Sequence, residues 1–222
     1  MNPRSTSADK RKAESYYRQG VRAYQDWQVE EAVEALEKAA RLYPAKAEYH
    51  IALAQALARY GDFDRALREL ANYLRLKPDS PVAPRIEQLF ARGMDAVEEV
   101  LTRKMKAERM PLNLIGAAIQ MWMEFRIILG EEPLVVPKPE AWAAALDYTV
   151  RKVNLRDVAL SELAASYGVS PDTVRKHHKR LVQMLDIMPC DYRYFTGEDN
   201  PLDKLVEAAE LLEALETRFK QE

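Results

Sequence analysis

The sequence predicts an all-α fold, in which a short array of helical hairpins is followed by a five-helix domain. Two observations predict it: the chain has only 7 glycines in 222 residues, and no run alternates β-branched with polar residues. A third, the 48% content of hydrophobic residues, shows that the chain can bury a substantial core in one or two domains.

Composition narrows the class of protein. The formal net charge of −2 excludes a general polycation, so a nucleic-acid contact must come from a local basic patch. The single cysteine, Cys190, excludes an internal disulfide framework and fits a reducing compartment. No apolar segment follows the charges of residues 1–12, which excludes a secretory signal there. Residues 112–129 are apolar but include Glu124 and Arg126, which favours a buried helix over a membrane span. We therefore expect a cytoplasmic protein without membrane contact.

Charge is distributed unevenly along the chain. Residues 1–12 carry four basic residues against one acidic residue, and we expect them to form a flexible basic tail. Residues 151–189 carry seven basic against four acidic residues, whereas residues 190–222 carry four against nine. An amphipathic helix is expected at 202–219, with an acidic exposed face. This contrast suggests that the acidic helix folds over the basic segment and masks it.

A repeat with a period of 34 residues occupies the first third of the chain. Pro44 and Pro78 are 34 residues apart, and the same offset joins Ala32 to Ala66. These residues resemble two tetratricopeptide repeats, at 13–46 and 47–80. The family's signature positions are held by Tyr16, Gly20, Ala23, Ala32, Leu36, Ala39 and Pro44 in the first repeat, and by Leu53, Ala54, Gly61, Ala66 and Pro78 in the second. Trp27 replaces the usual glycine of the first inter-helix turn, and His50 replaces the usual aromatic residue of the second repeat.

The resemblance implies a concave groove lined by the first helix of each repeat. Its expected lining residues are Glu14, Tyr17, Val21 and Tyr24 from the first repeat and Ile51, Gln55 and Arg59 from the second. The family's Lys and Asn clamp for a C-terminal carboxylate is absent from these positions. Two alternatives remain: the groove binds an external protein or peptide, or the repeats pack against their own C-terminal domain or a second copy, which would make a homo-oligomer.

The next segment is expected to cap the repeats, because two repeats need a neighbour to bury their apolar faces. Residues 81–109 are predicted to form a capping and linker helix, running from about 82 to 106. Its apolar stripe consists of Ile86, Phe90, Val97, Leu101 and Met105. Met110 and Pro111 then mark the start of a helical domain at 110–222. That domain is predicted to contain helices at 112–129 and 140–152, a helix-turn-helix at 159–185, an irregular stretch at 188–200 and the final acidic helix.

The stretch 159–185 carries the clearest functional signal. Gly168 suits a sharp turn after the first helix, Ser170 suits the cap of the second, and Pro171 suits its first position. Together with the Ala-rich helix before it, the run 138–185 resembles the second cyclin-type repeat of the transcription factor B class. It also fits the general prokaryotic repressor pattern, from which His177 departs because an apolar residue is usual there. The resemblance implies a cyclin-like domain in which His178 packs inward.

The second helix of this stretch has two distinct faces. Val174, His178, Leu181 and Leu185 define a buried face. The candidate DNA-binding residues lie on the other face: Ser170, Thr173, Arg175, Lys176, Lys179 and Arg180. By resemblance, Thr173, Arg175 and Lys176 would reach bases, and Lys179 and Arg180 would contact phosphates. Asp172 on the same face would repel DNA unless it accepts from a cytosine amine.

The residues therefore predict an adaptor or transcription regulator that binds double-stranded DNA, with the repeats binding protein. The alternative is a scaffold in which the helix-turn-helix packs or docks protein. We expect no enzyme, no cofactor and no metal site, since the adjacent His177 and His178 point about 100° apart on a helix and no catalytic constellation stands out.

Overall fold

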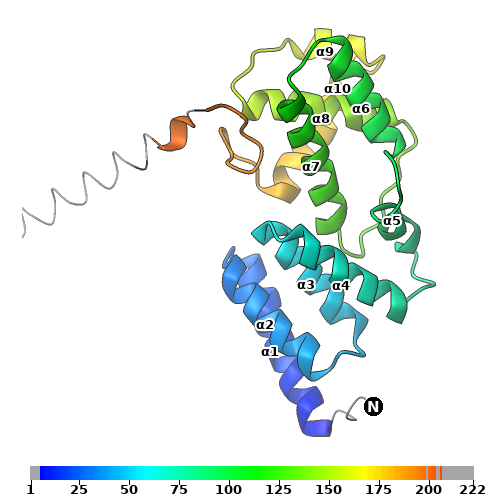
Figure 1. The fold of residues 1–222 in the computed structure, drawn as a ribbon, viewed down its shortest axis with the longest axis vertical. Helices are drawn as coiled ribbons and strands as arrows, with labels where there is room; N and C mark the ends of the chain where they lie inside the picture. The colour runs from blue at the N-terminus through cyan, green and yellow to red at the C-terminus, as the bar shows by residue number, and fades with distance from the viewer. Residues whose placement is uncertain (1–5, 199, 204–205, 207–222) are drawn as a thin grey trace, which may run out of the picture. The chain divides into compact units, whose positions relative to one another are not determined.

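The computed structural model describes residues 6–198, 200–203 and 206, and it is helical (Figure 1). Its elements are α1 (Ser7–Gln25), α2 (Val29–Leu42), α3 (Ala47–Tyr60), α4 (Phe63–Leu76), α5 (Ala83–Gln88), α6 (Ala96–Ala107), α7 (Leu112–Ile128), α8 (Pro139–Val153), α9 (Leu160–Ser166) and α10 (Pro171–Leu185). No strand occurs among the described residues, so the predicted all-α fold is confirmed.

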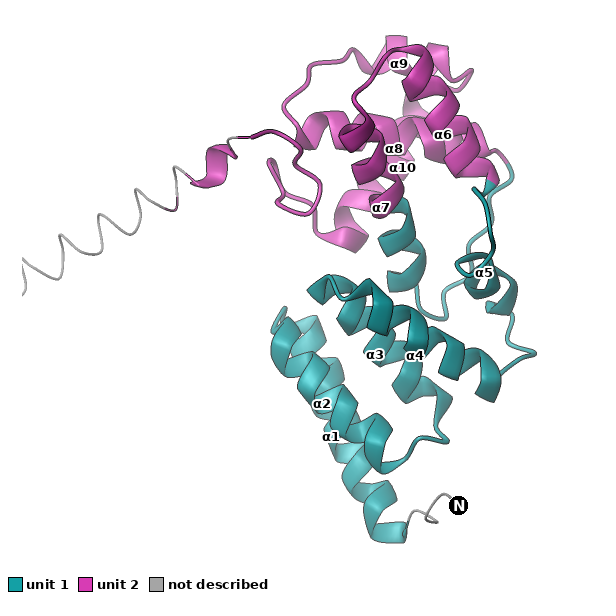
Figure 2. Cartoon of the chain, viewed as in Figure 1, with its two compact units in different colours: residues 1–95, 122–137 teal, residues 96–121, 138–222 magenta. Residues whose placement is uncertain are grey.

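The chain forms two compact units (Figure 2). Unit 1 comprises residues 1–95 and 122–137, and unit 2 comprises residues 96–121 and 138–222. The predicted boundary at 110 therefore does not coincide with the division of the structure. Helix α7 is shared, because its first part belongs to unit 2 and its last part, from Trp122, belongs to unit 1.

Unit 1 contains the two helical hairpins that the 34-residue period predicts. α1 packs on α2, α2 on α3, and α3 on α4. The small residues of the repeat signature lie between these helices: Gly20, Ala32, Ala39, Ala54 and Ala66 are all buried. At Gly20 the approach is close, because a Cβ added there would lie 2.6 Å from Cγ of Leu36. The small side chains thus set the spacing of the hairpins.

The first helix begins earlier than the sequence led us to expect. Thr6 caps α1: its hydroxyl accepts from the backbone N–H of Asp9 at 3.1 Å, and the Asp9 carboxylate accepts from the Thr6 N–H at 2.9 Å. This capping box satisfies two donors that the first turn would otherwise leave unpaired. Residues 7–12 of the predicted flexible tail are consequently helical, and residues 1–5 lie outside the described part of the chain.

The single capping helix expected at 82–106 is instead two helices, α5 and α6. Gly93 between them has φ of +117°, a left-handed conformation that ends a helix, and Phe90 is 44% exposed. Val97, Leu101 and Met105 are buried in unit 2, where α6 packs against α8. The apolar stripe therefore belongs to two different cores.

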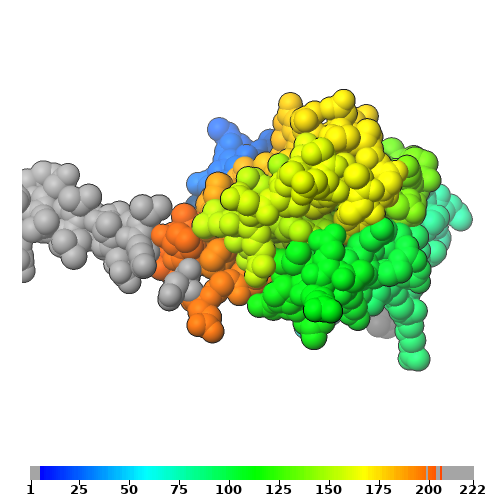
Figure 3. Space-filling view, turned by 90° about the horizontal axis from the view of Figure 1, so that it is seen from above, coloured from blue at the N-terminus to red at the C-terminus, as the bar shows by residue number. Residues whose placement is uncertain are grey.

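Helix α8 is the centre of unit 2. Residues 141–147 are buried without interruption, and α8 packs against α6, α9 and α10. Figure 3 shows atoms of the α9–α10 segment, in yellow, and of α6, in green, on one face of the molecule. The irregular stretch after α10 is anchored by Tyr194, which is fully buried and accepts a hydrogen bond at its carbonyl from the Asn154 side chain at 2.9 Å.

The chain is helical at 201–203, where the final helix was expected to begin. Most of that helix, and with it the predicted masking of the basic segment, lies outside the described residues.

Candidate functional site

The turn between α9 and α10 is built by local backbone chemistry. Gly168 has φ of +66°, and the N–H of Val169 donates to the carbonyl of Ala164 at 3.0 Å, which closes the end of α9. The hydroxyl of Ser170 then accepts from the N–H of Thr173 at 3.2 Å, and Pro171 occupies the first position of α10. The stop, the cap and the proline stand where the sequence predicts them.

This turn is tied to α8 by a buried polar network. The hydroxyl of Tyr167 donates to Asp147 at 2.9 Å, and the guanidinium of Arg151 donates to the same carboxylate at 2.6 and 3.0 Å. Arg151 also donates at 2.6 Å to Glu108, the residue that follows α6. Burial raises the pKa of Tyr167, and the Asp147 charge raises it further, so the phenol stays a neutral donor. Asp147 thus joins the turn to α8, and Arg151 joins α8 to the residue that follows α6.

One side of α10 is buried against α8, as predicted. Val174, Leu181 and Leu185 are fully buried. The His178 imidazole lies 2.8 Å from the Thr149 hydroxyl, which itself donates to the carbonyl of Ala145 at 2.6 Å. His178 therefore packs inward as the resemblance implied.

His177, which departs from the repressor pattern, also contacts α8. Its ring stacks on the indole of Trp142, with ring centroids 4.2 Å apart. An aromatic contact thus replaces the apolar packing that the pattern would supply.

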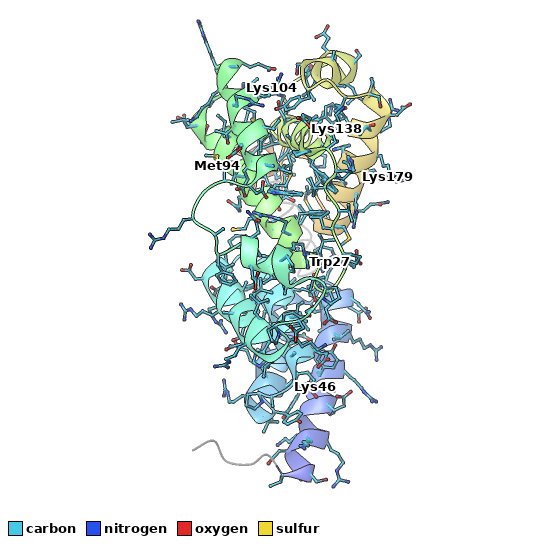
Figure 4. The ribbon with its side chains drawn as sticks, turned by 90° about the vertical axis from the view of Figure 1, so that its right-hand side faces the viewer. Trp27, Lys46, Met94, Lys104, Lys138 and Lys179 are labelled. Carbon is cyan, nitrogen blue, oxygen red and sulfur yellow. The ribbon has the colours of Figure 1, made fainter. Side chains whose placement is uncertain are left out.

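The other side of α10 carries the candidate DNA-binding residues. Ser170, Arg175, Lys176 and Lys179 are exposed, while Thr173 and Arg180 are half-buried. Figure 4 shows Lys179 at the margin of the molecule. The set therefore runs from the N-cap of α10 along the helix, with four exposed and two half-buried members.

Ser170, Thr173, Arg175 and Arg180 have partners within the unit. The Arg180 guanidinium lies 5.9 Å from the ring centroid of Trp142. The hydroxyls of Ser170 and Thr173 lie 2.8 Å apart, so both serve the helix cap. Asp172 pairs with Arg175, and both side chains are exposed.

The sequence did not indicate two further cations at the turn, Lys104 and Lys138. The Lys138 ammonium donates to the carbonyl of Gly168 at 2.9 Å, and the Lys104 ammonium donates to the carbonyl of Ser166 (Figure 4). Carbonyls at a helix C-terminus lack helical partners and attract cations. Because both lysines are distant in sequence from the turn, only the unpaired carbonyls at the end of α9 could have suggested them.

The predicted groove residues of unit 1 lie together in two contact groups. In the first group, Tyr17 stacks on Tyr49 with ring centroids 4.9 Å apart. In the second, the guanidinium of Arg59 lies 4.0 Å from the ring centroid of Tyr24 and 3.9 Å from that of Trp27. Of the remaining lining residues, Ile51 is buried and Val21 and Gln55 are half-buried.

Gln55 is engaged by the protein's own chain. Its side-chain amide donates to the carbonyl of Ile128 at 2.6 Å, and a Cβ added to Gly130 would lie 2.5 Å from the same amide nitrogen. Arg85 of α5 donates to the carbonyl of Arg126 at 2.7 Å, and Tyr73 of α4 donates to Glu131 at 2.7 Å. Side chains of α3 and α5 thus satisfy carbonyls at the C-terminal end of α7, and Tyr73 of α4 binds the Glu131 carboxylate that follows it. The repeats find their neighbour in residues 122–137.

The repeats also contain a buried histidine, His50, whose two ring nitrogens both face hydrogen-bond acceptors. The Nδ1 of His50 lies 2.6 Å from the Glu69 carboxylate, and its Nε2 lies 2.8 Å from the carbonyl of Pro44. Both partners only accept, so both ring nitrogens must carry a proton. Burial alone lowers the pKa of His50, but the bonds to Glu69 and Pro44 outweigh it and raise the pKa.

The histidines of unit 2 behave in the opposite way. Burial lowers the pKa of His177, with Lys176 and Arg180 adding to the effect, and burial beside Lys152 lowers the pKa of His178. Stability from His50 is therefore complete below about pH 6.5 and is lost as pH rises through its raised folded-state pKa. The contribution of His177 and His178 to the stability of unit 2 is complete above about pH 6.5. It falls as pH drops toward their lowered folded-state pKa values.

We expect these opposite signs in a pH titration. NMR of the three imidazoles should give one midpoint above and two below about 6.5. Hydrogen exchange should show α3 and α4 more protected at the acid end and α8 and α10 more protected at the alkaline end. In His50→Gln the first trend should vanish and the second remain. Three coincident midpoints would contradict the assignment.

Comparison with known proteins bears on the first unit. Residues 23–92 match the model of the tetratricopeptide repeat family. The match begins in α1 and extends past α4 through α5. Unit 1 therefore contains a tetratricopeptide repeat, an architecture whose surfaces serve protein interaction.

The chain is also similar to a curated protein and was compared with solved structures. It is 30% identical to the uncharacterized protein YccF of Bacillus subtilis (strain 168) over 115 residues, which cover 49% of this chain and 31% of that protein. The chain thus spans about a third of that relative's length. No solved structure matches the chain. None of the described helices combines the length and apolar character that a bilayer crossing requires.

Proposed function

We propose that the protein is a DNA-binding adaptor, in which α10 contacts duplex DNA and the tetratricopeptide unit binds a protein. The observation that supports this best is the division of α10 into two sides. Its inner side is fixed to α8 by buried residues, and its outer side presents Arg175, Lys176 and Lys179 to solvent. A rigidly held helix with a basic outer side fits the major groove of B-DNA.

The order of residues along α10 suggests a role for each. Ser170 and Thr173 hold the N-terminal end, where the helix dipole favours phosphate oxygens. Arg175 and Lys176, in the first two turns, are placed to reach base edges. Lys179 and Arg180, one turn further on, are placed for phosphates. The resemblance of residues 138–185 to a transcription factor B repeat supports the same orientation.

The ion pair between Asp172 and Arg175 is compatible with this proposal. Both side chains are exposed, at 88% and 62% of the side-chain surface. Exposed pairs contribute only about 0–1 kcal/mol, so Arg175 can exchange Asp172 for guanine or phosphate at little cost. Asp172 would then act as a selectivity element that tolerates a cytosine amine and disfavours other bases.

A protein scaffold remains the second candidate, and one observation favours it. Lys104 and Lys138, the cations nearest the turn, donate to the chain's own carbonyls and so contribute less to a phosphate surface.

Salt-dependent binding to duplex DNA separates the two functions. The logarithm of affinity of the wild-type protein should fall linearly with the logarithm of salt concentration. Arg175→Ala with Lys176→Ala should weaken binding by about tenfold to a hundredfold and reduce the salt slope by about two contacts. Fluorescence anisotropy with a mixed-sequence duplex measures both quantities.

A matched double variant controls for the loss of charge. Arg103→Ala with Arg156→Ala removes two exposed cations from unit 2 outside α10. It should leave affinity within about twofold, because neither arginine belongs to the proposed contact helix. Equal losses in both double variants would refute α10 as the contact surface. If the wild-type protein binds no duplex at low salt, the DNA-binding proposal is wrong and the protein-scaffold function is favoured.

A further inference from the structure

Two hollows open on one edge of the repeats, which we call the turn edge. It is formed by the α1–α2 turn, the α3–α4 turn and the helix ends beside them. The first hollow has a volume of about 420 Å³ and is lined by Trp27, Gln28, Val29, Glu30, Glu31, Arg59 and Tyr60. The second has a volume of about 450 Å³ and is lined by Tyr60, Gly61, Asp62, Phe63 and Asp64. Tyr60 lines both, so the hollows form one surface.

Trp27 on this edge is held in an unfavourable backbone conformation. Trp27 and Gly61 are 34 residues apart and thus occupy the same position of the repeat. Both are left-handed, with φ of +60° at Trp27 and +92° at Gly61. Glycine adopts this conformation without steric cost, whereas another residue is strained there. The fold gains little in return, since Trp27 is 44% exposed.

The aromatic rings of the turn edge are partly exposed, and one face of Trp27 is covered by Arg59. Tyr60 is 55% exposed beside Trp27. The guanidinium of Arg59 lies 3.9 Å from the Trp27 ring centroid, which shows that this ring accepts a cation on its face. Exposed Trp and Tyr side chains that flank a hollow are typical of binding hot spots.

The charge of the turn edge determines the kind of partner. Four carboxylates line the two hollows, from Glu30, Glu31, Asp62 and Asp64, against the guanidinium of Arg59, and Asp62 also pairs with Arg65 at 3.5 Å. An acidic, aromatic surface is complementary to lysine and arginine side chains, which bind carboxylates by charge and rings by cation–π contact.

We propose that the turn edge docks a lysine- or arginine-rich segment of a partner protein. The cations of the segment lie against Trp27 and Tyr60, and the four carboxylates neutralise them. This surface adjoins the predicted groove at Arg59 and extends beyond it to the two turns, whereas Gln55 of the groove already holds the chain's own Ile128. It deepens the protein-binding half of the proposed function and is independent of the DNA-binding half, because its residues belong to unit 1 and α10 to unit 2.

The test measures binding of a fluorescein-labelled oligo-arginine peptide to the full chain, with oligo-glutamate as the negative probe. The wild-type protein should bind only the basic peptide, more weakly as salt rises. Trp27→Gly should weaken binding by about tenfold at unchanged protein charge, because it removes the ring that makes the cation–π contact. The same variant should unfold at a temperature equal to or above that of the wild type, because glycine relieves the strain at φ +60°.

Further variants separate a built site from general attraction. Tyr60→Ser removes the second ring from an exposed position and should also weaken peptide binding. This variant tests the proposal even where Trp27→Gly does not fold. Glu30→Gln with Glu31→Gln should weaken binding more than Glu34→Gln with Glu87→Gln, which removes two exposed carboxylates of unit 1 outside the hollows. Wild-type affinity in both ring variants, or equal losses in the two charge variants, would overturn the proposal.

Discussion

Replacing Asp147 with alanine should destabilise unit 2 by about 3–5 kcal/mol, because it leaves a buried cation without its main partner. Asp147 is fully inaccessible and accepts from Arg151 and Tyr167. In the variant, Arg151 keeps only Glu108, whose side chain is 38% exposed, and the Tyr167 hydroxyl loses its acceptor. Denaturant unfolding should show the loss. Hydrogen exchange should place it in α8 and α9, with the repeats unaffected.

Two variants distinguish an ion-pair effect from general sensitivity of the unit. Asp157→Ala removes an exposed carboxylate from the loop after α8 and should change stability by less than about 0.5 kcal/mol. Asp147→Ala with Arg151→Ala should lose less than the sum of the two single variants, because each single variant leaves the other charge unpaired. A loss below about 1 kcal/mol for Asp147→Ala would show that the network does not hold the turn.

The same variant connects stability to the proposed DNA contact. Tyr167 ends α9, three residues before the Ser170 cap of α10. Loss of its anchor should loosen the turn that presents the outer side of α10. At temperatures where unit 2 remains folded, DNA affinity of Asp147→Ala should still fall, although no DNA-facing residue has changed.

Structural features that depend on residues close together in the sequence could be predicted from the sequence. Gly168, Ser170 and Pro171 specify a turn and a cap through their own backbone preferences, and the structure has both. The repeat register follows from the 34-residue offset, since small residues recur where helices must approach closely. The capping box of Thr6 and Asp9 is equally local, and the expectation of a flexible tail up to residue 12 overlooked it.

Features that depend on tertiary contacts could not be predicted in this way. The apolar residues from Ile86 to Met105 fit one helical period, yet Gly93 separates two helices that serve different cores. The contact between Gln55 and Ile128 joins residues 73 positions apart. Asp147 is one of several polar residues in an Ala-rich helix. Only the folded unit shows that Arg151 and Tyr167 both donate to it. Periodicity indicates which residues are buried, but tertiary packing determines which element each of them is buried against.

Substitution of two helical glycines should change the stability of the protein in opposite directions, and the loss at one of them is the second large effect that we expect. In α1, a Cβ on Gly20 would lie 2.6 Å from Cγ and 3.1 Å from the backbone nitrogen of Leu36, which is 1% exposed. In α7, a Cβ on Gly116 would meet no atom within 4 Å. Alanine favours a helix over glycine by about 1 kcal/mol at either position. Only at Gly20 does overpacking oppose this gain, by about 1–3 kcal/mol or more as the side chain grows.

We therefore expect Gly20→Val to lose about 3 kcal/mol of stability and Gly116→Ala to gain about 0.5–1 kcal/mol, as measured by denaturant unfolding. Leu36→Ala in the Gly20→Val background should recover part of the loss by opening space at Cγ. Recovery should stay incomplete, because the backbone of Leu36 cannot move away. A stabilised Gly20→Val would show that α1 and α2 separate freely, and close packing at the repeat's small residues would then not hold the hairpin together.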